Sequence, residues 1–235
     1  MSGLLITGTD TGVGKTLVAC GLAACLRAAG RTVGVLKPVE TGCAMRDGRL
    51  YPEDAARVAG FAGSRAPLDE LCPYRFAPPV APSVAADQAG VTIRPERIVS
   101  LFQRISRRHD TVLVEGAGGL LVPLVGRYTF ADLARDLGVG LLVVVGSKLG
   151  ALNHALLTLH HAQAQSLPLR GYIMNHPMSS ADAATATNSE TLAGLTDVAC
   201  LGSVPHLTLS ADGQDDTRIL LAAFGRHVRV DRIFD

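Results

Sequence analysis

Residues 8–16 read Gly-Thr-Asp-Thr-Gly-Val-Gly-Lys-Thr, directly after the apolar residues 4–6. Residues 17–29 follow with a helical composition. A strand, a glycine-rich loop and a helix in this order are typical of a phosphate-binding loop. Glycines let backbone N–H groups converge on phosphate oxygens, and the helix N-terminus adds a positive dipole. The stretch therefore predicts a nucleoside triphosphate site rather than a glycine-rich turn without a ligand.

Two side chains of this loop have a direct use in binding Mg-ATP. Lys15 can reach the β- and γ-phosphates, and the Thr16 hydroxyl can coordinate Mg²⁺. The loop departs from the common form in one respect, because five residues instead of four separate Gly8 from Gly14. We expect further nucleotide contacts from the loop and the first helical turn, at Gly12, Val13, Gly14 and Leu17.

The composition indicates one α/β domain that covers residues 1–235. Hydrophobic residues make up 48% and charged residues 18%, as in globular proteins generally. A net charge of +1 gives no electrostatic reason to expect nucleic acid or an anionic membrane as a partner. The longest strongly apolar run, residues 141–145, is too short to span a bilayer, and no signal peptide is recognisable. Five cysteines without a C-x-x-C pair indicate reduced thiols and a cytoplasmic protein.

Short β-rich runs alternate with helical stretches along the chain. We expect strands near residues 3–7, 32–37, 111–115, 140–146, 170–175 and 198–203. We expect helices near residues 15–29, 53–60, 95–108, 129–137, 150–166 and 185–195. This alternation predicts a parallel sheet with helices on both faces, and ligands at the carboxyl ends of its strands.

Lysine is scarce in this chain, which has three lysines and 19 arginines. A lysine kept among so many arginines suggests ammonium chemistry that a guanidinium cannot supply. Lys37 ends the second expected strand on the phosphate loop's side of the sheet, and Pro38 stiffens the backbone directly after it. We favour a functional role for Lys37, with a surface lysine at a strand end as the alternative. The sequence assigns no role to Lys148 or to Cys43.

Two carboxylates stand where a magnesium site could form. Glu115 ends the apolar strand 111–115, and a buried strand does not normally end in an acid without a partner. We expect Glu115 to bind Mg²⁺ directly or through water, beside the glycine-rich turn Gly116-Ala117-Gly118. Asp54 follows Pro52 at the start of a helix. From the residues alone, Asp54 is either a metal ligand or an acid that stabilises the helix dipole.

Three other segments lead to weaker expectations. Residues 67–82 contain five prolines, together with Tyr74 and Phe76, and predict a stiff loop over an apolar substrate surface. Asn175 closes one expected strand and residues 202–206 follow the next, so both should face the nucleotide. The charged tail, residues 226–235, is expected to be solvated.

Taken together, these stretches resemble the dethiobiotin synthetases. The resemblance rests on GTDTGVGKT (8–16), KPVETG (37–42), Asp54, PYRFAPP (73–79), VEGAGG (114–119), KLGALNHA (148–155), Asn175 and Pro205. It extends from about residue 6 to residue 205, and that family shares the five-residue loop spacing. It implies a P-loop NTPase-like three-layer sandwich with a mostly parallel sheet of about seven strands. It also implies a homodimer whose substrate site lies at the interface.

The resemblance also implies the penultimate step of biotin synthesis. The substrates would be 7,8-diaminononanoate (7,8-diaminopelargonate), CO₂ and Mg-ATP, and the products dethiobiotin, ADP and phosphate. One amine would capture CO₂ as a carbamate, and a carbamate oxygen would take the γ-phosphoryl group. The second amine would then close the ureido ring and expel phosphate.

Residue roles follow from the same resemblance. Lys15, Lys37 and Thr11 match catalytic positions, while Thr16, Asp54 and Glu115 match the metal ligands. The substrate would contact Lys37, Thr41, Gly150, Ala151, Leu152 and Asn153, of which the last four would come from the neighbouring subunit. The nucleotide would contact the phosphate loop, Gly116, Ala117, Gly118, Asn175, His176, Val204, Pro205 and His206. Gly12 and Thr41 depart from residues that other members carry.

A partitioning-type ATPase switch is the alternative of another class. Such proteins share the loop but carry a second lysine five residues before the main one, where this chain has Asp10. Some end in a basic amphipathic membrane helix, which residues 219–235 could mimic. Gly225 and scattered β-branched residues weaken that comparison.

Overall fold

Six parallel strands form the central sheet in the computed structural model, which describes residues 2–179, 183–209 and 216–234. Their spatial order is β12-β11-β10-β1-β7-β2. The bounds are β1 Ser2–Gly8, β2 Val33–Leu36, β7 Thr111–Gly119, β10 Gly140–Gly146, β11 Leu169–Asn175 and β12 Cys200–Val204. All six lie where the sequence predicts strands.

The sheet is buried on both faces because consecutive residues of each strand enter opposite hydrophobic cores. On β1, Leu4 and Ile6 belong to one core and Leu5 to the other. On β10, Leu142 and Val144 alternate in the same way with their neighbours. A strand buried on both sides explains the continuous apolar runs in the sequence.

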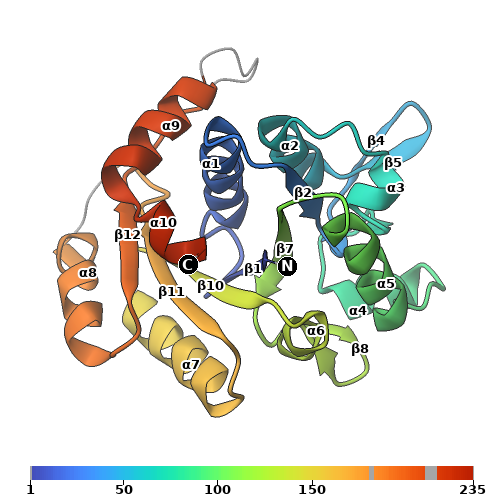
Figure 1. The fold of residues 1–235 in the computed structure, drawn as a ribbon. Helices are drawn as coiled ribbons and strands as arrows, with labels where there is room; N and C mark the ends of the chain where they lie inside the picture. The colour runs from blue at the N-terminus through green and yellow to red at the C-terminus, as the bar shows by residue number, and fades with distance from the viewer. Residues whose placement is uncertain (1, 180–182, 210–215, 235) are drawn as a thin grey trace.

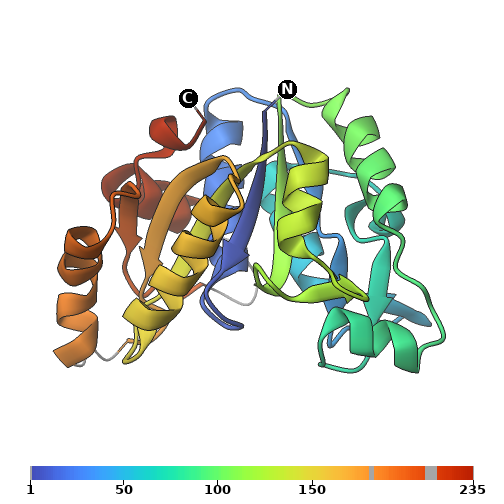
Figure 2. The ribbon, with the colours of Figure 1, turned by 90° about the horizontal axis from the view of Figure 1, so that it is seen from below.

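Helices cover both faces and give the three-layer arrangement that the sequence predicts (Figures 1 and 2). One layer contains α1 (Lys15–Ala28), α2 (Glu53–Ala62), α9 (Asp216–His227) and α10 (Val230–Phe234). The other contains α5 (Pro95–Ser106), α6 (Phe130–Leu137) and α7 (Ala151–Ala164). Beside α7, α8 (Ala183–Leu195) buries Leu192 in the same core. The predicted helices are therefore confirmed to within a few residues at most ends.

In the described residues the central sheet has six strands, and not the expected number of about seven. After β2 the chain passes Pro38, which has no N–H to donate, and the N–H of Lys37 donates to Leu71 O at 2.7 Å. The following strand β3 (Val39–Thr41) pairs with β6 (Tyr74–Phe76) in a separate two-stranded sheet. Beyond β2 the chain therefore adds strands to the separate β3–β6 sheet, and β2 stays the edge strand of the central sheet.

Residues 67–82 contain more regular structure than the predicted stiff loop. Besides β6, they include α3 (Leu68–Leu71) and the start of α4 (Pro82–Gln88). Tyr74 and Phe76 enter the hydrophobic core. The prolines allow this because Pro67 and Pro82 stand at or next to helix starts, where a missing N–H costs nothing. Two hairpins complete the fold, β4 (Ala44–Arg46) with β5 (Arg49–Tyr51), and β8 (Pro123–Val125) with β9 (Tyr128–Thr129).

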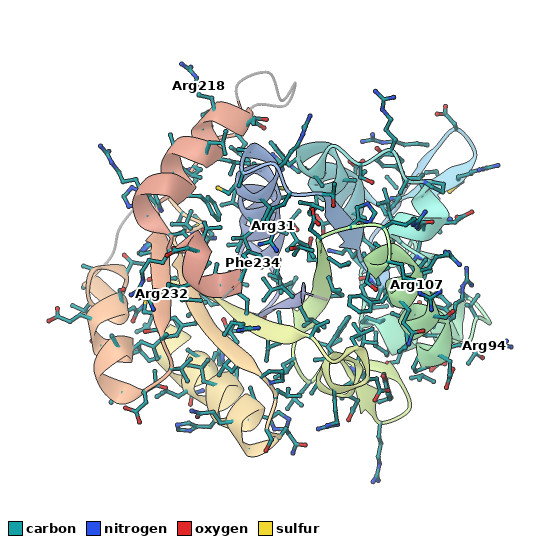
Figure 3. All side chains as sticks on the ribbon, viewed as in Figure 1. Arg31, Arg94, Arg107, Arg218, Arg232 and Phe234 are labelled. Carbon is teal, nitrogen blue, oxygen red and sulfur yellow. The ribbon has the colours of Figure 1, made fainter. Side chains whose placement is uncertain are left out.

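The expectation of a solvated tail holds for the charged residues among those described, which are exposed, but not for the apolar ones. Val228 forms a β-bridge with Gly202, and Ile233 on α10 is 1% exposed. The guanidinium of Arg31 lies 5.8 Å from the ring centre of Phe234, and Figure 3 shows the two side chains together. The apolar residues among the charges therefore anchor the tail to the α1 layer. Asp235 lies outside the described residues.

The described part of the chain contains no helix that is both long and apolar enough to cross a membrane. All five cysteines lie within it and are free thiols, as the sequence predicts.

Candidate active site

The phosphate loop connects β1 to α1, and its shape requires glycine at two positions. Gly12 and Gly14 have φ angles of 75° and 95°, in the left-handed region that favours glycine. A Cβ atom on Gly14 would also lie only 2.1 Å from Nδ2 of Asn175. The loop thus combines left-handed turns with a close approach to β11, and it leads directly into the N-terminus of α1.

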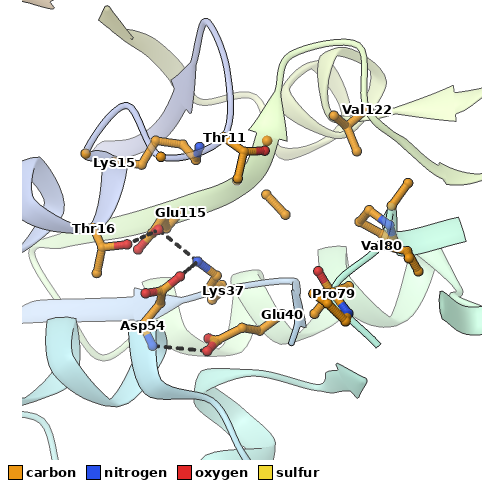
Figure 4. Close-up of a pocket in the computed structure, with 18 residues that line it drawn as sticks. Thr11, Lys15, Thr16, Lys37, Glu40, Asp54, Pro79, Val80, Glu115 and Val122 are labelled. Atoms are coloured by element: carbon orange, nitrogen blue, oxygen red, sulfur yellow. Dashed lines mark hydrogen bonds and ion pairs between the residues drawn. The ribbon is translucent and has the colours of Figure 1, made fainter. Parts of the chain in front are cut away.

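A cavity of about 580 Å³ lies where β1, β2 and β7 end (Figure 4). Its lining brings together residues from four separate segments that the sequence nominated. These are Thr11, Gly12, Gly14, Lys15, Thr16, Lys37, Thr41, Asp54, Glu115, Gly116, Ala117 and Gly118. An apolar wall at the other end is formed by Pro79, Val80, Ala81, Pro82 and Val122. The first four lie in the predicted stiff loop of residues 67–82, whereas nothing in the sequence indicated Val122.

Lys37 lies at the centre of the charged part of this cavity. Its Nζ donates to Oδ2 of Asp54 at 2.6 Å and to Oε1 of Glu115 at 2.8 Å. Lys37 and Glu115 are each 3% exposed, so this is a buried ion pair and not a surface contact. Burial alone would lower the pKa of Lys37, but the charges of Glu115 and Asp54 outweigh burial and raise it. Lys37 is therefore a fixed positive charge, and the alternative of a surface lysine is wrong.

Glu115 is held by two donors and keeps one oxygen free of protein partners. The Thr16 hydroxyl donates to Oε1 of Glu115 at 2.8 Å, the same oxygen that accepts from Lys37. The second oxygen, Oε2, is buried and has no hydrogen-bond partner among the described residues. A buried acceptor left in this state needs a ligand or ordered water to offset its desolvation.

Thr16, Asp54 and Glu115 supply a set of oxygen donors suited to Mg²⁺. Among the described residues, no cluster of three or more His, Cys, Asp or Glu side chains is placed to hold a metal ion. Mg²⁺ does not need such a cluster, because it is usually held by one or two carboxylates together with substrate phosphates. The free Oε2 of Glu115 and the nearby Asp54 carboxylate fit this pattern.

Lys15 and Lys148 meet different parts of Asp10. Nζ of Lys15 donates to the backbone carbonyl of Asp10 at 3.0 Å, and burial lowers the pKa of Lys15 although Glu115 opposes this. Nζ of Lys148 pairs with the Asp10 carboxylate at 2.9 Å, and both side chains are about half exposed. At the position where the ATPase switches carry their second lysine, this chain therefore has the Asp10 carboxylate, which is paired with Lys148 of the same chain.

Glu40 is a site residue to which the sequence assigned no role, although it stands inside the stretch KPVETG. It is 6% exposed and lines the same cavity. Burial raises the pKa of Glu40 to about 7, against the opposing charge of Lys37. The sequence does contain a hint of this role, because Glu40 follows closely on an apolar strand. An acid that is buried at such a place needs a hydrogen-bond partner.

The residues expected around the base lie at the ends of β11 and β12. Asn175 is 1% exposed and its Nδ2 donates to the Val13 carbonyl at 2.8 Å, while Oδ1 is buried and has no partner in the part of the chain that the structure describes. Two further cavities, of about 280 and 550 Å³, adjoin this end. The first is lined by Leu17, Asn175, His176 and His206 among others, and the second by His176, Pro205 and His206 among others. Val204 is fully buried and takes part through its carbonyl, which accepts from the N–H of His176 at 3.0 Å.

The segment Gly150, Ala151, Leu152 and Asn153 is not brought into the phosphate cavity. None of these four residues lines that cavity in the described chain. They form the start of α7, with Gly150 at the N-cap and a φ angle of 87°. Ala151 is buried in the core, whereas Asn153 is exposed. Within one chain, Lys37 and Thr41 therefore line the phosphate cavity and residues 150–153 do not, although the resemblance assigns both groups to one substrate.

Solved structures with a similar fold include cell division proteins. MinD of Pyrococcus furiosus has a TM-score of 0.57 and 16% sequence identity, covering 99% of this chain and 98% of that chain. The MinC:MinD complex of Aquifex aeolicus also has a TM-score of 0.57, with 13% identity and coverage of 99% and 94%. At this identity the likeness shows the fold alone, and it does not favour the ATPase switch as a function.

Sequence relatives are more specific. A family model described as an AAA domain matches residues 2–213. The ATP-dependent dethiobiotin synthetase BioD of Anaeromyxobacter sp. (strain Fw109-5) is 42% identical over 222 residues, 94% of this chain and 98% of that protein. The protein of the same name from Bacillus subtilis (strain 168) is 36% identical, with 88% of each chain covered. This chain belongs to the AAA domain family and to the dethiobiotin synthetases.

Proposed function

We propose that this protein is an ATP-dependent dethiobiotin synthetase, a cyclo-ligase of biotin biosynthesis that works in the cytoplasm. One observation carries the proposal beyond the family name. Lys37 is buried against Glu115 and Asp54 in the cavity that the phosphate loop also lines, and the opposite wall of this cavity is apolar. A charged end suits phosphoryl transfer, and an apolar wall suits the hydrocarbon chain of 7,8-diaminononanoate (7,8-diaminopelargonate).

The proposed reaction has three steps. One amine of the substrate attacks CO₂ and loses a proton, which gives a carbamate. A carbamate oxygen then attacks the γ-phosphorus of ATP, and ADP leaves. The second amine attacks the carbonyl carbon of this carbamic-phosphoric anhydride, loses a proton and expels phosphate, which closes the ureido ring of dethiobiotin.

The chain's own residues provide charge and position for these steps. Lys15 and Lys37 stabilise negative charge on the transferred phosphoryl group. The protein forms no covalent bond to this group, so its contribution is charge and position. Thr11 and Thr41 line the cavity and provide hydroxyl groups for the carbamate or the amines. Holding the carbamate in line with the phosphorus removes much of the entropic cost of the reaction.

Thr16, Asp54 and Glu115 would hold Mg²⁺ next to the β- and γ-phosphates. When bound, Mg²⁺ neutralises phosphate charge and helps to align the γ-phosphoryl group. The nucleotide itself would lie along Gly12, Val13, Gly14, Leu17 and the turn Gly116, Ala117 and Gly118. Its base would reach Asn175, His176, Val204, Pro205 and His206, which lie at the ends of β11 and β12.

The substrate carboxylate would bind to a second copy of the chain. The start of α7 offers first-turn N–H groups beyond Ala151, whose own N–H donates to the Lys148 carbonyl at 3.1 Å, and a positive dipole end, which suit a carboxylate. Two observations support a homodimer that delivers this segment in trans. Residues 150–153 do not line the phosphate cavity of their own chain. Large apolar side chains are also exposed around this region, with Leu149 83%, Leu157 62% and Leu121 56% exposed.

An assay with the purified protein tests the proposed reaction. It should convert 7,8-diaminononanoate to dethiobiotin only when ATP, Mg²⁺ and bicarbonate are all present, with one phosphate released per ring closed. ATP hydrolysis that is independent of the diamine, with no ring product, would contradict the proposal and favour the ATPase switch.

A further inference from the structure

The N-terminus of α2 is capped by a carboxylate from another segment of the chain. Pro52 occupies the N-cap position and provides no side-chain cap. Glu40 on β3 accepts instead from the backbone N–H of Asp54 at Oε1 (3.1 Å) and of Ala55 at Oε2 (3.2 Å). Both carboxylate oxygens of Glu40 therefore satisfy first-turn donors that have no partner within the helix.

Glu40 is a built-in part of the cavity rather than a surface acid. It is 6% exposed, and its own carbonyl accepts from the Cys43 thiol at 3.4 Å. Burying a carboxylate is costly unless hydrogen bonds replace its water. The two N–H donors and the positive end of the α2 dipole provide that replacement.

The cap fixes the backbone of Asp54 relative to β3. Asp54 has a side chain that is 45% exposed, so packing restrains it only in part. Its Oδ2 nevertheless lies 2.6 Å from Nζ of Lys37, close to Glu115 (Figure 4). The position of the Asp54 carboxylate therefore depends on where Glu40 holds the first turn of α2.

We propose that Glu40 is a positioning residue that holds Asp54 in the place from which it coordinates Mg²⁺. This inference rests on the proposed role of Asp54 as a metal ligand. Glu40 would not touch the metal ion itself, but would act on Asp54 through the backbone of α2. Groups that orient metal ligands in this way typically change metal affinity about 10–100-fold when they are removed.

The variant Glu40→Gln tests the role with little change in size. Gln offers one acceptor oxygen, and its NH₂ group faces the second N–H donor, so the first turn of α2 should lose its fixed position. Binding of Mn²⁺ in the presence of ADP, followed by electron paramagnetic resonance, should weaken about 10-fold or more. The Mg²⁺ concentration for half-maximal turnover should rise in parallel. Wild-type Mn²⁺ affinity in this variant would overturn the inference.

Glu53→Gln is a matched control on the same turn. Glu53 precedes Asp54 directly, is about half exposed and forms an ion pair with Arg46. This control makes the same chemical change in the first turn of α2 but does not touch the cap. It should leave Mn²⁺ affinity as in the wild type. A loss equal to that of Glu40→Gln would show that charge near the helix end matters and the cap does not.

A double variant separates this inference from the function on which it rests. If Glu40 acts through Asp54, adding Glu40→Gln to Asp54→Asn should cause no further loss of Mn²⁺ affinity. Additive losses would mean that Glu40 acts on the cation by another route, and would overturn its positioning role. If Asp54→Asn itself leaves Mn²⁺ affinity unchanged, the proposed metal site fails. If only Asp54→Asn has an effect, the metal site stands and the role of Glu40 is wrong.

A third variant, Glu40→Asp, keeps the charge but shortens the side chain. It should reproduce the loss of Mn²⁺ affinity, because the shorter acid no longer reaches both N–H donors. Full affinity in Glu40→Asp would mean that charge alone suffices. Urea unfolding of each variant confirms that binding is measured on folded protein.

Discussion

The phosphate end of the cavity and the start of α7 differ in how completely one chain builds them. At the phosphate end, Lys37, Asp54, Glu115 and Thr16 are joined by hydrogen bonds of 2.6–2.8 Å. At the start of α7, Asn153 is exposed and Leu149 is 83% exposed. The first region is preorganised within one chain, whereas the second exposes a polar and a large apolar side chain.

This difference separates two kinds of function. Phosphoryl transfer depends on charges placed in advance, since reorganising them during the reaction would cost free energy. Binding of a distant carboxylate needs only N–H groups on a rigid helix, and these can come from a second subunit. Substitutions at the phosphate end should therefore reduce turnover, and those at α7 should reduce substrate affinity.

The largest effect is expected at Lys37. Lys37→Ala removes the buried ammonium that we propose stabilises the transferred phosphoryl group, and kcat should fall about 100-fold or more. ATP affinity, measured by calorimetry, should change little because the phosphate loop and Lys15 remain. A variant with near-normal kcat would remove Lys37 from the chemistry. Lys148→Met serves as its matched control, since it removes a lysine from the α7 region.

Glu115→Gln should mainly affect the metal requirement. The amide cannot provide the charge of a carboxylate, so the Mg²⁺ concentration for half-maximal activity should rise about 10-fold or more. Turnover at saturating Mg²⁺ should recover in part. An Mg²⁺ titration that matches the wild type would exclude Glu115 from the metal site.

Asn153→Asp should affect the diamine and spare ATP. This change keeps the size of the side chain and adds a negative charge beside the proposed carboxylate site, so the KM for the diamine should rise about 10-fold. We choose Asn153 because it is exposed, whereas a charge at the buried Ala151 would disturb the core. Gln163→Glu, at the other end of the same helix, is the control and should leave this KM unchanged. A rise in the KM for ATP instead would place the segment at the nucleotide.

The smallest effect is expected at Lys148, whose ion pair with Asp10 connects the two regions. Both side chains are about half exposed, and pairs of this kind contribute roughly 0–1 kcal/mol. Lys148→Met should change the free energy of unfolding in urea by less than about 1 kcal/mol and kcat/KM by less than about threefold. A loss comparable to that of Lys37→Ala would show that the two regions are coupled through this pair.

The sequence predicted those features that depend on local patterns. Apolar runs located β1, β7 and β10, and GTDTGVGKT located the phosphate loop and the start of α1. It did not predict the contacts that join distant segments. The Glu40 cap on α2 spans 14 and 15 residues, and the Thr16–Glu115 bond spans 99. Such contacts follow from packing, which periodicity does not reveal.

The strand count and the tail show the same limit. Pro38 ends the pairing of β2, yet only the structure shows that β3 continues with β6 as its partner. The tail reads as charged because five of its ten residues are Arg or Asp. Ile233 and Phe234 nevertheless anchor it to the α1 layer, and no period in so short a segment indicates which side is buried.

Subunit complementation tests most directly whether the two regions work together across a dimer. Lys37→Ala and Asn153→Asp subunits are mixed after exchange, and activity is measured at a diamine concentration far below the raised KM. In a mixed dimer one site collects both changes and the other collects neither. Random pairing makes about half of the dimers mixed, so we predict that about a quarter of the wild-type rate returns. Activity no higher than the average of the two parent variants, despite demonstrated exchange, would show that each site lies within one chain.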